Sequence, residues 1–202
     1  MRDLGWPALA ALLLAIGLSA GAAAADRALG LQPPAPVACA AKACDRDPAQ
    51  LADFAVRFYA WYVDTTIAED TLSGAARRQE ERAHAAILDR MLSPGFRAKL
   101  AKLRKEMAAS KGDMPEPDPS LSSLCGGVEA DNILCAQDYD GRWRTDASAK
   151  IDTSAPDAIR LTVTLPWPAD PNTKAPSRPH LLLVTLVPDR GYWTIDRIAA
   201  GD

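Results

Sequence analysis

The sequence has few of the residues from which catalytic and metal sites are usually built. Only two histidines occur in 202 residues, and neither has a partner that the sequence can supply. His84 lies in a charged helical segment and is expected to be solvated, and His180 is expected at the edge of a strand start. The pattern G-x-S-x-G does not occur after the predicted signal peptide, Gly126-Gly127 is a plain turn and no phosphate loop, and no C-x-x-C pair occurs. We therefore predict no cofactor and no metal, and we lean against an enzyme.

The sequence also lacks an excess of positive charge. Its net charge is −3, and Lys and Arg alternate with acidic residues along the predicted helices. Binding of nucleic acid would call for a basic patch, so we predict no nucleic-acid partner.

Long apolar runs are missing after the first 25 residues. At the start, Arg2 precedes an uncharged run over about 8–18, and Ala23-Ala24-Ala25 fits a cleavage site. The run is shorter than the roughly 20 residues that span a bilayer; an uncleaved membrane helix is the alternative. We predict a signal peptide over 1–25, cleaved near Ala25, a periplasmic or secreted protein, and no stable membrane anchor after cleavage.

Cysteines are few but even in number. The four are Cys39, Cys44, Cys125 and Cys135, which behind a signal peptide predict disulfides in an oxidising compartment. Three pairings are possible. We favour Cys39 with Cys44 and Cys125 with Cys135, because each closes a short loop. A zinc site is the less favoured alternative, since the spacing is unlike that of zinc ligands and no histidine is near.

The first half of the exported chain is predicted to be helical. Residues 26–46 are rich in Ala and Pro and are interpreted as a tether. Asp47 suits a helix N-cap and Pro48 the first helical position. A charged helix over about 75–92 and a third helix beginning at Ser93-Pro94 follow. The first helix is expected to bury one stripe, which Trp61 widens: Leu51, Phe54, Ala55, Phe58, Tyr62 and Thr65. The third helix is expected to bury a narrower stripe: Phe96, Leu100, Leu103 and Met107.

The second half changes to the period of strands. Residues 132–139 alternate loosely, and 159–165 alternate clearly between apolar and polar side chains. Residues 180–187 are apolar on both faces, as in an inner strand, and a turn at 188–191 leads to a closing strand over 192–198. Helices followed by an antiparallel meander predict an α+β domain over 47–202.

Three motifs in this order resemble a known family. They are FYAWY at 58–62, DNILCAQD at 131–138 and YWTIDRI at 192–198. On these motifs the chain resembles the DUF3828 family of secreted bacterial proteins, over roughly 48–198. The resemblance implies an NTF2-like or cystatin-like fold, in which a long helix is cradled by a curved antiparallel sheet, and it brings no catalytic residues. The sequence departs from the family where Ile133 replaces an aromatic and in the long, proline-rich loop 166–179.

Asp138 is the strongest candidate for a catalytic acid. On an apolar face of an NTF2-like cone it could act as a general base. The interpretation that we favour is structural: its carboxylate accepts backbone N–H bonds in the turn 138–141.

Aromatic residues supply the other candidates. Trp61, Tyr62 and Trp193, with Gln137 and Asp138, could line a ligand pocket, although core packing is the favoured role of the aromatic three. Trp143 and Trp167 lie beside turn or proline residues, so they are candidates for exposed contacts with a partner. For Trp167 the alternative is that it folds back onto the strand end.

These observations favour a non-enzymatic binding or protein-interaction module of the envelope or the extracellular space. One version is an inhibitor or immunity-type protein that uses loop 166–179 and a sheet edge against another envelope or secreted protein. The alternative is a small lyase, isomerase or hydrolase that uses Asp138 in the cone. A structural role in the cell envelope is also left open.

Overall fold

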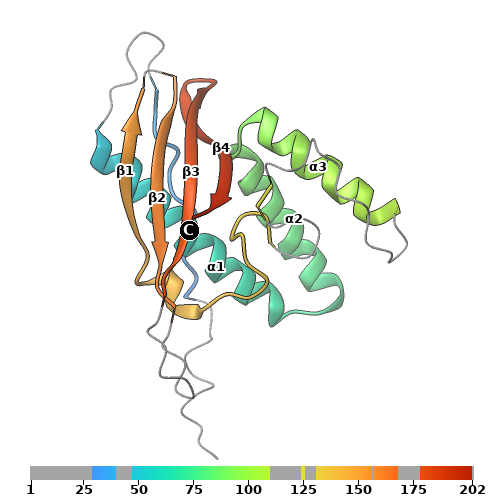
Figure 1. Cartoon of the computed structure of the whole chain (residues 1–202). Helices are drawn as coiled ribbons and strands as arrows, with labels where there is room; N and C mark the ends of the chain where they lie inside the picture. Colours follow the sequence, from blue (N-terminus) through green and yellow to red (C-terminus); the bar gives the residue numbers. More distant parts are fainter. Residues whose placement is uncertain are drawn as a thin grey trace, which may run out of the picture.

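The architecture is that of an α+β protein, as predicted. In the part of the chain that the computed structural model describes, three helices pack on a four-stranded antiparallel sheet that is not closed (Figure 1). The expected signal peptide, Cys44 and most of loop 166–179 lie outside this part. The described residues are 29–39, 47–109, 124–125, 131–155, 157–167 and 178–201.

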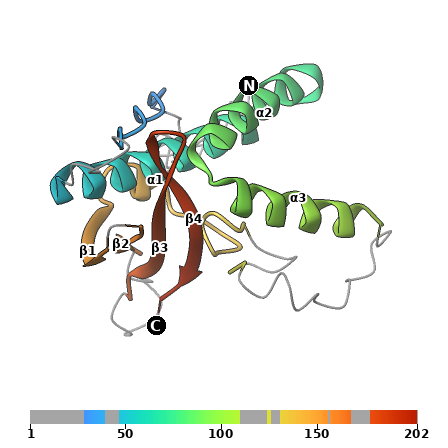
Figure 2. The same cartoon turned by 90° about the horizontal axis from the view of Figure 1, so that it is seen from above.

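Helix α1 (Pro48–Asp70) begins where the sequence predicts. The Asp47 carboxylate accepts a hydrogen bond from the backbone N–H of Ala49 at 2.9 Å, which satisfies one of the free donors of the first turn. The predicted stripe is buried except for Thr65, which is half-buried, and Figure 2 shows α1 lying across one face of the sheet. None of the helices in the described part of the chain is long and apolar enough to cross a membrane.

Helices α2 (Gly74–Met91) and α3 (Pro94–Ala109) follow as a pair that extends past β4 (Figures 1 and 2). The charged α2 docks by its last turns, where Leu88 and Met91 are buried. Ser93 begins α3, because its hydroxyl accepts from the backbone N–H of Phe96 at 3.1 Å and donates to Asp196 of β4 at 2.5 Å. The start of α3 is thereby fixed to the sheet.

The sheet is a meander in the order β1-β2-β3-β4. Strands β2 (Ile159–Leu165), β3 (His180–Asp189) and β4 (Tyr192–Ala200) match the predicted segments, whereas β1 (Ser148–Ser154) was not predicted. Arg190 and Gly191 join β3 to β4 with φ of +49° and +83°, the two positive values of a tight hairpin turn. Leu183 on the outer face of β3 remains 45% exposed.

Residues 131–139 form a turn and not the predicted strand. Ile133 and Leu134 are both buried in this turn, which the backbone N–H of Asp131 closes by donating to the carbonyl of Ala136 at 3.0 Å. The Asp131 carboxylate accepts from both of their backbone N–H groups, at 2.7 and 2.9 Å, and Cys135 takes a positive φ of +53°. The disulfide between Cys125 and Cys135 closes the turn, so this predicted pair is confirmed.

Residues 29–39, in the segment interpreted as a tether, are bonded to the domain. Val37 accepts from the backbone N–H of Trp193 at 2.9 Å, and the N–H of Cys39 donates to Gly191 at 2.7 Å. Cys39 is itself disulfide-bonded, while its predicted partner lies outside the described residues. This segment therefore runs beside the start of β4.

Candidate functional site

Side chains fill the space between α1 and the sheet. Phe58 and Tyr59 are fully buried there, Trp61 is 3% exposed and Trp193 is 1% exposed. The cavities lined by described residues lie elsewhere: between α2 and α3, beside the segment 34–38, and next to the turn at 131–133. The aromatic residues Trp61 and Trp193 therefore pack in the core and line none of these cavities.

Asp138 and Gln137 are exposed on the turn after Ala136, and neither lines any of these three cavities. The turn-stabilising role predicted for Asp138 belongs to other acids. Asp131 holds the turn before it, and Asp140 accepts from the backbone N–H of Arg142 at 2.8 Å. Asp138 is exposed and has no hydrogen-bond partner among the described residues.

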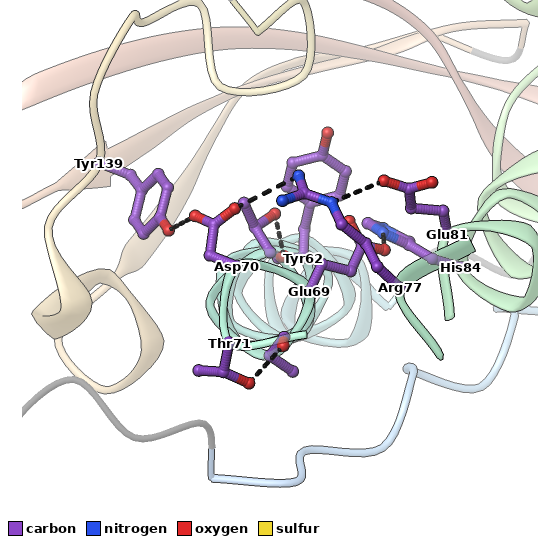
Figure 3. Close-up of polar contacts among 10 residues, drawn as sticks. Tyr62, Glu69, Asp70, Thr71, Arg77, Glu81, His84 and Tyr139 are labelled. Carbon is purple, nitrogen blue, oxygen red and sulfur yellow. Dashed lines mark hydrogen bonds and ion pairs between the residues drawn. The ribbon is translucent and has the colours of Figure 1, made fainter. Parts of the chain in front are cut away.

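His84 is buried, so the prediction that it is solvated is wrong. Its Nδ1 lies 2.7 Å from Glu69 Oε1 (Figure 3). Its ring packs against Trp61 at 4.9 Å and Tyr62 at 5.0 Å between ring centroids. Because a carboxylate only accepts, Nδ1 carries the proton of this bond. Nε2 is buried and has no partner in the described part of the chain. The pair joins α2 to α1 inside the helical layer.

A second polar chain fixes the corner between α1 and α2 (Figure 3). The Tyr139 hydroxyl donates to Asp70 at 2.7 Å, Asp70 lies 3.6 Å from Arg77, and Arg77 bonds Glu81 at 2.9 Å. These side chains are largely exposed, so each ion pair contributes little to stability. Their combined effect is to hold the chain just beyond the turn 131–136 against the end of α1.

Tyr62 reaches the turn at 131–136. Its hydroxyl donates to Asp131 Oδ2 at 2.7 Å, and both residues line a cavity of about 190 Å³ beside α3. Burial and the nearby Asp131 charge raise the pKa of the Tyr62 and Tyr59 phenols well above their usual value. At neutral pH both phenols are therefore protonated, and Tyr62 serves as a hydrogen-bond donor and not as a base.

The larger cavity is a groove between α2 and α3, of about 370 Å³. Buried leucines form its floor, and its walls include alanines from both helices, whose side chains are short. The smaller cavity beside Tyr62 adjoins it, because the two share Leu88, Leu100 and Arg104. We call the larger cavity the α2–α3 groove; its lining includes Ala85, Leu88, Asp89, Leu92, Arg97, Ala98, Leu100, Ala101 and Arg104.

Two arginines of α3 line this groove and have no acidic partner among the described residues. The Arg97 Nε atom is buried and has no hydrogen bond among the described residues. Arg104 has no ion pair in the same part of the chain. Sequence analysis treated the basic residues as evenly interleaved with acids and so overlooked α3. The helix carries five basic residues against Glu106 alone, namely Arg97, Lys99, Lys102, Arg104 and Lys105, a net charge of +4.

Trp143 is fully buried, so the prediction that it is an exposed contact residue is wrong. The short 3-10 helix η2 (Gly141–Arg144) turns its ring inward, and Nε1 donates to the carbonyl of Pro166 at 2.8 Å. The ring stacks on His180 at 5.5 Å, and His180 Nε2 bonds the carbonyl of Leu134 at 2.7 Å. Trp167 is 39% exposed and stays a candidate contact residue, while its ring lies 5.1 Å from that of Trp143 between centroids.

A buried acid on α1, Asp64, was missed by the sequence analysis. It is 2% exposed, lies 3.5 Å from the buried Arg144 guanidinium, and accepts from the backbone N–H groups of Leu29 and Leu31. The only signal in the sequence is an acid inside the apolar run FYAWYVD. With every polar neighbour satisfied, this cluster is structural.

No protein-family model matches the chain, and neither does any curated protein. Among solved structures, the chain is similar to a protein of unknown function from Bacteroides thetaiotaomicron VPI-5482. The two are 14% identical with a TM-score of 0.37, over 76% of this chain and 94% of the other. This distant likeness adds nothing to the assignment of the site.

Proposed function

We propose that the chain is an exported, non-enzymatic protein-interaction module that binds a partner protein through the α2–α3 groove. The observation that carries the proposal is the groove itself: an apolar floor beside two arginines that have no acidic partner among the described residues. Partner-binding surfaces commonly combine an apolar centre with charged residues at the rim. We also propose that the chain belongs to the DUF3828 family, which its motifs resemble, and that its fold is NTF2-like.

One feature supports export, and another counts against the alternative enzyme. The Cys125–Cys135 disulfide fits an oxidising compartment such as the periplasm or the extracellular space. An enzyme built on Asp138 would need that acid in a cavity, whereas Asp138 is exposed and lines none of the three cavities. The inhibitor or immunity-type version is retained with the groove as its contact surface, in place of loop 166–179.

Site-specific photo-crosslinking tests the proposal. A benzophenone amino acid is placed at Ala101 in the groove, at Ala108 on the same helix outside it, and at Leu183 on the outer face of the sheet. All three positions are exposed, so the fold should tolerate them. After expression with its own leader and irradiation of intact cells, we expect a discrete crosslinked protein from Ala101 alone. Equal capture from all three positions, or capture from Leu183 alone, would refute the groove as the contact surface.

A further inference from the structure

The charge of α3 is opposite to that of the whole chain. The helix has a net charge of +4, while the whole chain has a net charge of −3. Among the described residues, Asp89 is the one acid that lines the α2–α3 groove, and it comes from α2. The α3 wall is therefore positive and the α2 wall is not, so charge complementarity favours a partner whose acids lie along α3.

The spacing of Arg97 and Arg104 selects the conformation of the partner. They are seven residues apart on one helix and line the same groove, which places them about 10.5 Å apart along the helix axis at 1.5 Å per residue. Side chains on one face of an extended strand repeat at about 6.6 and 13 Å, because alternate residues point to opposite faces. Two acids seven residues apart on a helix repeat at the same 10.5 Å. A helix fits this spacing, and a strand does not.

The floor of the groove fits the apolar side of such a helix. Leu88, Leu92 and Leu100 lie at its base, and Ala85, Ala98 and Ala101 leave room above them. Amphipathic helices bind grooves of this kind through apolar residues at helical spacing. Apolar residues between the two acids of the partner would face the leucines while the acids face the arginines.

From these observations we infer that the α2–α3 groove takes an amphipathic helix of a partner protein whose two carboxylates, seven residues apart, pair with Arg97 and Arg104. The inference rests on the proposed function and names the chemistry of the partner.

Fluorescence anisotropy with a synthetic probe tests this inference. The probe is a labelled 15-residue helical peptide, capped at both ends, with glutamates at positions 4 and 11 and leucines at positions 7, 8 and 14. We expect saturable binding to the exported protein, weakened about tenfold when either glutamate is changed to glutamine, a loss of about 1.4 kcal/mol per pair. A matched peptide with the second glutamate moved to position 9, on another face of the helix, should bind as weakly as the glutamine peptide.

Variants of the protein supply the matched controls. Arg104→Gln should weaken binding about tenfold and Ala101→Trp, which fills the groove, at least as much. Lys105→Gln makes the same charge change on α3 outside the groove lining and should leave binding unchanged. Far-ultraviolet circular dichroism of each variant should match the parent.

Three results would overturn the inference. The first is equal binding of the two glutamate spacings, and the second is an equal loss in Arg104→Gln and Lys105→Gln; both would reduce the attraction to unspecific charge. The third is binding of vesicles containing phosphatidylglycerol that displaces the peptide, which would make α3 a membrane-binding surface. If Ala101 crosslinks a protein in cells while the peptide does not bind, the partner chemistry is wrong and the proposed function stands. If neither occurs, both fail.

Discussion

Removing one oxygen from each of two buried tyrosines on α1 should change stability in opposite directions. Tyr62 donates a 2.7 Å hydrogen bond to the Asp131 carboxylate. The Tyr59 hydroxyl is fully buried and has no partner among the described residues. Tyr59→Phe and Tyr62→Phe are therefore the same chemical change at two positions that differ mainly in hydrogen bonding.

The expected magnitudes follow from that difference. A hydrogen bond to a charged group contributes about 1.5–3 kcal/mol, so Tyr62→Phe should lower the free energy of unfolding by about 2 kcal/mol. A buried hydroxyl without a partner costs about 1–3 kcal/mol in lost hydration. Removing it leaves a small void, so Tyr59→Phe should raise the free energy of unfolding by about 1 kcal/mol.

Urea unfolding followed by tryptophan fluorescence measures both values with the disulfides intact. Equal slopes against urea in the two variants and the parent would show that the unfolded states are comparable. A loss of stability in Tyr59→Phe as large as that in Tyr62→Phe would refute the reasoning, since it would mean that the Tyr59 hydroxyl is also well bonded.

The same tyrosines predict how stability depends on alkaline pH. Their pKa values are raised in the folded state above the ordinary value of 10.0, so the unfolded chain releases these protons first. The contribution of these phenols to the free energy of unfolding is complete below about pH 10. It is lost as the pH rises further, by about 1.4 kcal/mol per pH unit for each phenol. Tyrosinate absorbance should therefore appear for these two residues only with unfolding, and each phenylalanine variant should show a shallower loss of stability above pH 10.

Three further predictions concern the core and the crosslink. Asp64→Asn leaves a buried guanidinium without its charge partner and should cost about 3 kcal/mol in urea unfolding, while Asp64→Asn with Arg144→Met, which removes that guanidinium and keeps an acceptor oxygen at position 64, should recover part of it; equal losses in the single and double variants would argue against a buried pair. Phe58→Ala should cost about 3–5 kcal/mol, and an unchanged melting curve would contradict its place in the core. Thiol labelling without reduction should find none of the four cysteines free, and replacing Cys125 and Cys135 by serine should cost about 3 kcal/mol.

Local signals in the sequence were enough to place most of the helices and strands. Asp47-Pro48 and Ser93-Pro94 mark two helix starts because capping and proline chemistry act within one turn. Residues 159–165 alternate clearly because one face of β2 is buried and the other is not. β1 gave no such signal, since only Ala149 and Ile151 face the core and both are half-buried at the sheet edge.

The candidate site was mostly beyond the reach of sequence reasoning because it depends on how helices pack. His84 lies in a charged stretch, and only the contact of α2 with α1 buries it beside Glu69. The groove exists because alanines of α2 and α3 face each other, and no local pattern reports that pairing. Residues 132–139 were misread for another reason: a single carboxylate, that of Asp131, captures two backbone N–H groups and replaces strand pairing.

The Asp64 carboxylate has a consequence for where the folding unit begins. Leu29, Leu31 and Arg144 all converge on it, from parts of the chain more than a hundred residues apart. A polypeptide shortened to begin at Asp47 would retain every helix and strand, yet it would strip two donors from an anion sealed inside the protein. The smallest stable version of this protein is thus set by a polar requirement in its interior, and extends upstream of its first helix.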